Sequence, residues 1–166
     1  MFSSTWGGGV LGGMLLMGIV SSVFRISKKT IGLVGGLGTA FGLGLLTLTA
    51  LTGMQSLLMP ALVIMGLFTG FYNVGALSMM MDMTVEGSTG LYMGMWGMAQ
   101  AFGMGVSSFA SGTLKTVLIE SGLLAPAVGY TAIFGLEVVL MVVGVAVLRS
   151  VTTTDLTHAM EQGAGA

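Results

Sequence analysis

Three polar side chains that could do chemistry lie inside long apolar stretches: the amides of Asn73 and Gln100 and the carboxyl of Glu137. An amide oxygen can accept hydrogen bonds between helices, or it can bind the magnesium ion of a tetrapyrrole. A carboxylate deep in an apolar stretch is costly. We therefore expect Glu137 to be protonated and hydrogen-bonded within the protein, to serve a proton-linked site, or to contact a pigment or another subunit.

The remaining candidates are charged and cluster in two short connectors. Arg25, Lys28 and Lys29 lie in one connector, and Asp82 and Glu86 flank the other. These charges form either a solvated, ion-paired surface or a latch that holds two helix pairs together by salt bridges. No nucleophile or set of metal ligands accompanies the two acids, so the sequence does not favour hydrolysis and we expect no enzyme.

The composition restricts the protein class. The chain has 166 residues, of which 54% are hydrophobic and only 7% are charged, whereas a soluble domain carries about 25% charged residues. This composition is typical of an integral membrane protein. A net charge of −1 gives no indication of nucleic-acid binding. The absence of cysteine and the presence of a single histidine, His158, lead us to expect no metal site.

The apolar residues form continuous runs, each long enough for a membrane helix of about 20 residues. We expect an all-α, polytopic membrane helix bundle at 1–149, followed by a flexible cytoplasmic tail at 150–166. No basic segment precedes the first run, so we interpret it as a retained span rather than a cleaved signal peptide. The five predicted transmembrane helices are Thr5–Phe24, Ile31–Leu51, Leu57–Met81, Leu91–Leu114 and Ala127–Leu148.

The basic residues predict the orientation, because cytoplasmic connectors carry an excess of Lys and Arg. Arg25, Lys28, Lys29 and Arg149 fall on one side of a five-span chain, and Lys115 falls on the other. We therefore expect the N-terminus outside, or in the lumen, and the C-terminus in the cytoplasm.

Small residues recur every three or four positions, a spacing that lets helix backbones approach closely. We expect the row in the fourth span to pack against another helix. A methionine cluster at 79–104 would provide either an adaptable apolar surface or ordinary packing. Trp6, Trp96, Tyr92 and Tyr130 suit interfacial anchoring. The small-residue sets are Gly8 with Gly12, Gly9 with Gly13, Gly32 with Gly36, Gly38 with Gly42, and the row Gly90, Gly94, Gly97, Ala101 and Gly105.

One segment carries a family resemblance. Residues 82–103, which read DMTVEGSTGLYMGMWGMAQAFG, resemble the bacteriochlorophyll delivery family, the PucC-like and LhaA-like members of the major facilitator superfamily. The resemblance continues through the Glu137 helix to Arg149 and reaches back over 12–29. There, RISKK is similar to the basic loop between the second and third helices of a facilitator half.

The resemblance implies a partial facilitator fold. Family members have about twelve spans in two halves, and transport requires one half to rock against the other. This chain resembles the C-terminal half without its first helix, so its spans would correspond to helices eight to twelve. We therefore expect a fragment of a longer protein, a reduced gene product, or a subunit whose bundle is completed by a partner polypeptide or a second copy.

The resemblance also implies a function. Our leading hypothesis is an assembly factor for photosynthetic pigment–protein complexes that handles chlorophyll or bacteriochlorophyll in a thylakoid or bacterial inner membrane. The alternatives are a structural subunit of a light-harvesting or reaction-centre complex, and half of a split transporter. Carotenoid and membrane lipid are further expected ligands, and light-harvesting or photosystem subunits are the expected partners. Candidate pigment or polar contacts are Gln100, Asn73, Glu137, Trp96 and Tyr92.

Overall fold

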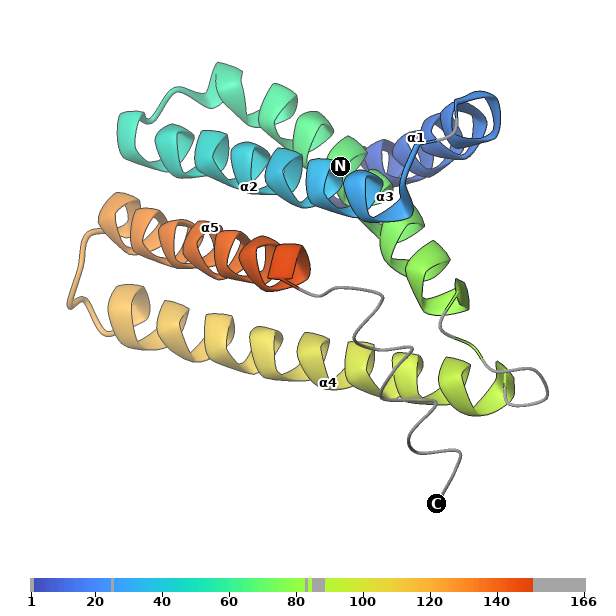
Figure 1. Ribbon diagram of the computed structural model, residues 1–166. Coiled ribbons are helices and arrows are strands. Elements are labelled where there is room, and N and C mark those ends of the chain that lie inside the picture. Colours follow the sequence, from blue (N-terminus) through green and yellow to red (C-terminus); the bar gives the residue numbers. More distant parts are fainter. Residues whose placement is uncertain (1, 25, 83, 85–88, 151–166) are drawn as a thin grey trace.

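The computed structural model describes residues 2–24, 26–82, 84 and 89–150, and within these ranges the chain is helical and contains no strand (Figure 1). The five predicted helical stretches are confirmed, and their ends shift by three residues or fewer. A 3₁₀ turn, η1 (Gln55–Leu57), precedes the third helix, and a π-helical turn, η2 (Thr116–Glu120), follows the fourth. The long helices are α1 (Phe2–Val23), α2 (Lys28–Thr52), α3 (Leu58–Asp82), α4 (Thr89–Lys115) and α5 (Pro126–Ser150).

Among the described helices, four are long and apolar enough to cross a membrane: α1, α2, α3 with the preceding η1, and α5. The prediction of five spans is too high by one on this criterion. The exception is α4, which has 27 residues and therefore sufficient length. Its glycine, serine and threonine residues and Gln100 lower its mean hydropathy below that of a membrane-spanning helix.

Glycine and proline set the helix ends at two connectors. The chain leaves α2 at Gly53, whose φ of 70° is a left-handed conformation that glycine adopts without strain. The Gly53 N–H donates to the Thr49 carbonyl at 2.9 Å. Between α4 and α5, Gly122 takes a φ of 77°, and Pro126 then opens α5, where its missing N–H costs nothing.

The turn after α4 is held by an exposed ion pair. The Lys115 ammonium lies 3.1 Å from the Glu120 carboxylate, and the Thr116 hydroxyl donates to the same carboxylate at 3.1 Å. These hydrogen bonds, together with the Lys115 charge, hold the pKa of Glu120 below its usual value. The turn links the C-terminal end of α4 to the start of α5 (Figure 1).

The core is built by close backbone contact. α3 packs against α1 on one side and α2 on the other, and α5 packs on α2 (Figure 1). A Cβ placed at Gly70 of α3 would lie 2.9 Å from the Gly13 Cα of α1, and one at Gly75 would lie 2.7 Å from the Gly32 Cα of α2. Lipid supplies no hydrophobic drive between helices, so this close approach provides the packing energy. The buried apolar residues are Met17, Ile31, Ala40, Leu46, Ala61, Met79, Met80, Ile133 and Val145.

The small-residue rows divide into packed and unpacked sets. The pairs Gly9 with Gly13, Gly32 with Gly36, and Gly38 with Gly42 all lie against neighbouring helices, whereas Gly8 and Gly12 face open space. The predicted packing of the α4 row is wrong within the part of the chain that the structure describes. A Cβ at Gly90, Gly94, Gly97 or Gly105 would meet nothing within 4 Å, and Ala101 is exposed. The reason is that α4 stands apart and contains no buried residue.

Threonine hydroxyls inside the helices are satisfied by their own backbones. Thr39 donates to the Gly35 carbonyl at 2.9 Å, and Thr69 donates to the Met65 carbonyl at 2.7 Å. The two hydroxyls also lie 3.4 Å apart across the α2–α3 contact. Polar groups therefore enter the α2–α3 packing without leaving an unmade hydrogen bond.

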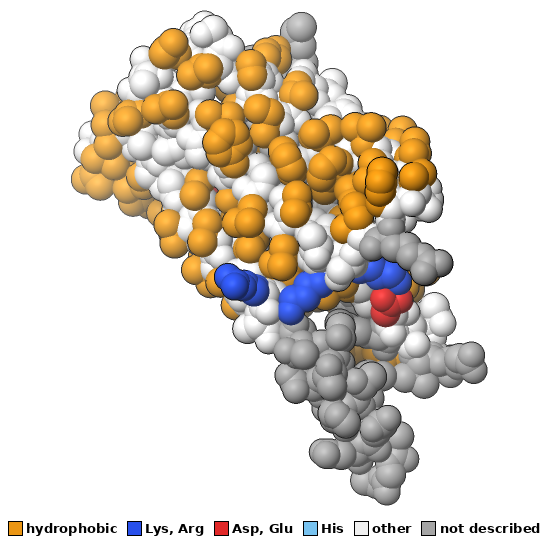
Figure 2. Space-filling view, turned by 45° about the horizontal axis from the view of Figure 1, so that its top comes forward, with side chains coloured by type: hydrophobic (Ala, Val, Ile, Leu, Met, Phe, Trp, Pro, Cys, Tyr) orange, Lys and Arg blue, Asp and Glu red, His pale blue; other side chains and the backbone are white. Residues whose placement is uncertain are grey.

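Charged side chains meet at one end of the bundle. Lys28 of α2 forms an ion pair with Asp82 of α3, and the Lys29 ammonium donates to the Arg149 carbonyl of α5 at 2.8 Å. In Figure 2 Lys and Arg side chains form a row along the edge of the apolar surface, with acidic side-chain atoms beside it. Three helices are thus tied together at the end where the sequence places most of the basic residues; which side of a membrane this is stays a prediction.

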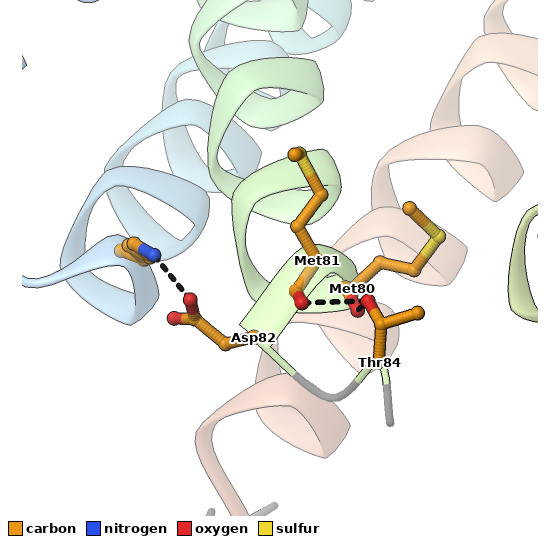
Figure 3. A network of polar contacts seen from close by, with 5 residues as sticks. Met80, Met81, Asp82 and Thr84 are labelled. Atoms are coloured by element: carbon orange, nitrogen blue, oxygen red, sulfur yellow. Dashed lines mark hydrogen bonds and ion pairs between the residues drawn. The ribbon is translucent and has the colours of Figure 1, made fainter. Parts of the chain in front are cut away.

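The Thr84 hydroxyl caps the C-terminal end of α3 (Figure 3). The Thr84 hydroxyl donates to the carbonyls of Met80 at 3.2 Å and Met81 at 2.6 Å. Carbonyls at a helix C-terminus have no partner inside the helix. The cap therefore closes α3 directly beside the Lys28–Asp82 pair.

We predict that Gly35→Ala destabilises the protein by about 1–3 kcal/mol, because the added Cβ would overlap the backbone of Tyr72. The matched control is Gly44→Ala on the same helix, where a Cβ meets nothing within 4 Å. Alanine favours a helix over glycine by up to about 1 kcal/mol, so the control should be neutral or stabilising. Denaturant titration of both variants in the same detergent measures the difference; equal stabilities would contradict the α2–α3 packing.

We predict a small, salt-dependent coupling between Lys28 and Asp82. Both side chains are about half exposed, so a double-mutant cycle with Lys28→Met and Asp82→Asn should give about 0.2–1 kcal/mol. The coupling should shrink when salt is raised, because exposed charges are screened. A coupling that is larger and insensitive to salt would show that the pair is shielded in the membrane-bound protein.

Candidate functional site

A cleft between α3 and α4 brings together the two mid-helix amides, Asn73 and Gln100. It consists of two overlapping hollows of about 360 Å³ and about 250 Å³. Asn73 from α3 and Trp96 and Gln100 from α4 line both hollows. We call these two hollows the α3–α4 cleft. Its remaining lining residues are Met14, Val74 and Leu77 in the larger hollow and Tyr72 and Ala99 in the smaller one.

The helices bring these residues to one level. Trp96 and Gln100 are four residues apart and therefore share a face of α4. Asn73 lies nine residues before Asp82, which places it about 14 Å along α3 from the charged end of the bundle. Gln100 lies near the middle of α4. The α3–α4 cleft is thus remote from both ends of the helices.

The cleft is polar but uncharged. The residues that line its two hollows include no carboxylate, ammonium, guanidinium or imidazole. Asn73 is half-buried and Gln100 is exposed. Among the described residues, neither amide has a hydrogen-bond partner in the protein. Each amide therefore offers one acceptor oxygen and two N–H donors to a ligand.

Glu137 lies elsewhere, in the middle of α5. It is half-buried and lines neither hollow of the cleft. Ile133, Met141 and Val145 follow the same four-residue spacing, and Met141 and Val145 lie next to Gly36 of α2. The α2-facing side of α5 therefore includes Glu137, and no described residue hydrogen-bonds to its carboxyl.

The other predicted contacts are dispersed. Tyr92 is half-buried on α4, one turn before Trp96, and it does not line the cleft. Tyr130 stacks on Phe134 of its own helix with ring centroids 6.2 Å apart. Of the proposed latch residues, Lys28 pairs with Asp82 and Lys29 contacts α5, whereas Arg25 and Glu86 lie outside the described residues.

Sequence reasoning missed five residues that line the cleft: Tyr72, Val74 and Leu77 of α3, Ala99 of α4, and Met14 of α1. Tyr72 and Leu77 belong to the same run as Asn73, so their placement on a site-forming helix could have been inferred from helical spacing. Met14 comes from α1, and no local pattern in the sequence links it to this site. Its contribution follows from the close α1–α3 packing.

A further hollow of about 430 Å³ runs along α4 and the π-helical turn. Its lining comes from one stretch of chain, so it is an open groove rather than a site formed between helices. No group of three or more potential metal ligands occurs among the described residues. The groove residues are Ser108, Phe109, Gly112, Thr113, Thr116 and Val117.

Comparison with known proteins gives a family match and two curated relatives. A model of the family described as PUCC protein matches residues 1–156. The chain is 30% identical over 147 residues to a Rhodobacter capsulatus protein named "Uncharacterized protein in puhA-bchM intergenic region"; the alignment covers 80% of this chain and 30% of that protein. It is 31% identical over 151 residues to the "Bacteriochlorophyll synthase 44.5 kDa chain" of the same species, with 86% and 35% covered.

The relatives are much longer than this chain, which spans about a third of each of them. No solved structure matches. The family match extends over nearly the whole sequence, from the first helix past the end of α5. On this basis the chain belongs to the PUCC protein family.

Proposed function

We propose that this protein is a pigment-handling membrane protein that assists the assembly of photosynthetic complexes. It would hold chlorophyll or bacteriochlorophyll non-covalently and present it to light-harvesting or photosystem subunits. The observation that carries the proposal is the uncharged α3–α4 cleft, with unpaired amides at Asn73 and Gln100, in a member of the PUCC family.

The chemistry of the cleft suits a large, mostly apolar and neutral ligand. Ligand sites commonly combine an apolar lining with a small number of polar groups that fix orientation. Here Trp96 offers a flat aromatic face, and Met14 offers a flexible thioether side chain. A charged ligand would find no counter-ion among the residues that line the cleft.

The relatives support the same ligand class. One carries bacteriochlorophyll in its name, and the other is named for its position between puhA and bchM. One name also contains the word synthase. Our proposal for this chain is binding rather than catalysis, because the cleft lining contains no carboxylic acid, imidazole or amine that could act as an acid or base.

The apolar surface of α4 supports a role with partners in the membrane. Phe102 is 74% exposed and Phe109 is 78% exposed, and the glycine row beside them is open. We propose that subunits of the receiving complex, or a polypeptide that completes the bundle, cover this helix. In this proposal the protein lies in a thylakoid or bacterial inner membrane with the Lys28–Asp82 end in the cytoplasm.

We predict that the full-length chain, purified in mild detergent from a photosynthetic host, carries chlorophyll-type absorption bands. Co-purifying light-harvesting or photosystem subunits should be present in less than stoichiometric amounts, because an assembly factor releases its client. The matched control is the Asn73→Leu, Gln100→Leu double variant, which should lose the bands and keep its helical circular dichroism.

Two outcomes would contradict this function. A colourless preparation that contains a separate multi-helix polypeptide would favour half of a split transporter. Stable one-to-one association with a photosynthetic complex, without pigment of its own, would favour a structural subunit.

We predict that Glu137→Leu does not lower the stability of the isolated chain. No described residue bonds to this carboxyl, so its removal breaks no hydrogen bond, and a carboxyl in hydrocarbon is itself costly. Thermal unfolding of Glu137→Leu and of the near-isosteric Glu137→Gln tests this. A loss confined to the leucine variant would reveal a polar partner on the α2–α5 side.

A further inference from the structure

The structure assigns a magnesium ligand: we propose that the Asn73 side-chain oxygen binds the central Mg²⁺ of a flat tetrapyrrole held in the α3–α4 cleft. Gln100 would hydrogen-bond to the edge of the same ring. This inference rests on the proposed pigment-handling function and adds to it the residue, the atom and the metal preference.

The charge balance of the cleft favours an amide as the ligand. The two negative charges of a deprotonated tetrapyrrole already neutralise Mg²⁺, so a protein ligand to the metal would need to supply a lone pair and no further charge. Magnesium is a hard cation that prefers oxygen, and an amide oxygen is neutral. A carboxylate in its place would add an unpaired charge far from water. Asn73 and Gln100 are the two amides that line the cleft, and neither is engaged by the described protein.

The arrangement of the two helices distinguishes Asn73 from Gln100. Trp96 and Gln100 share one face of α4, and Asn73 belongs to α3 across the cleft. Trp96 would hold the flat ring from the α4 side of the cleft, and Asn73 would bind the Mg²⁺ from the α3 side. Gln100 would serve as an N–H donor to polar groups of the ring.

The burial of the two amides also favours Asn73 as the magnesium ligand. Asn73 is half-buried among the packed α1–α3 residues, whereas Gln100 is exposed on a helix without buried residues. A metal ligand benefits from a rigid support, because its geometry is demanding.

Binding forms one coordinate bond from the amide oxygen to Mg²⁺ and releases the solvent or detergent ligand that held that position. No bond of the ring breaks, and no electron is transferred.

The test compares bacteriochlorophyll with its magnesium-free counterpart. Both are titrated into the full-length protein in detergent, and binding is followed by quenching of tryptophan fluorescence and by pigment absorption. We expect the magnesium form to bind at least about tenfold more tightly. In Asn73→Leu this ratio should fall to about one, because only the magnesium form loses a ligand.

Two further variants separate the roles of the amides. Gln100→Leu should weaken both pigments by a similar factor and preserve the ratio between them. Asn73→His should restore the preference for magnesium, because imidazole nitrogen also supplies a neutral lone pair. Circular dichroism of each variant verifies that the helices are intact, and Asn73→His keeps the test valid if Asn73→Leu does not fold.

The outcomes distinguish this inference from the function on which it rests. Equal affinity of the wild-type protein for both pigments would overturn the magnesium ligand and leave pigment handling in place. Loss of the magnesium preference in Gln100→Leu rather than in Asn73→Leu would overturn the assignment to Asn73. Failure of the wild-type protein to bind either pigment would overturn both proposals.

Discussion

The architecture depends on how closely α3 can approach its two neighbours. Within a membrane, apolar side chains gain little by leaving lipid for protein, so helices associate where their backbones can touch over a long contact. Gly66 and Gly70 give α3 such a surface toward α1, and Gly75 gives it one toward α2. α5 then packs against the outer side of α2, partly through Val145 beside Gly36. This packing also fixes one wall of the candidate site, because Asn73 belongs to α3, which packs against both α1 and α2.

The polar groups follow two different patterns. Threonine hydroxyls in the packed helices bond to carbonyls one turn earlier, and the charged residues gather at the ends of the helices. The amides of Asn73 and Gln100 and the carboxyl of Glu137 differ from both patterns, because they lie at mid-helix and have no partner among the described residues. Unmet polar groups at mid-helix are expensive in an apolar medium, so they mark positions where something outside this packed core is expected to bind.

The helices themselves were predictable because continuous apolar runs end at charged or helix-breaking residues such as Lys28, Gly53 and Pro126. The packing was only partly predictable. The pairs Gly32 with Gly36 and Gly90 with Gly94 have the same spacing, yet a Cβ at Gly36 would meet the Val145 side chain and one at Gly94 would face open space. Spacing identifies a small-residue face, and the tertiary arrangement decides whether another helix covers it.

The same distinction applies to the candidate site. Asn73, Trp96 and Gln100 stood out as polar or aromatic residues in apolar surroundings, and the structure places all three around one cleft. That Glu137 and Tyr92 do not line this cleft depends on the positions of α4 and α5, which no local pattern encodes. Met14 was not foreseen because its place in the lining results from the crossing of α1 over α3.

The position of the cleft has a consequence for access. Asn73 and Gln100 lie at mid-helix, and α4 has no buried residue that would seal the cleft along its length. A lipid-soluble molecule would reach such an opening sideways, by two-dimensional diffusion within the bilayer, without passing through water. Exchange would then be governed by the concentration of the molecule in the membrane, and the ion-paired end of the bundle would have no part in admitting it.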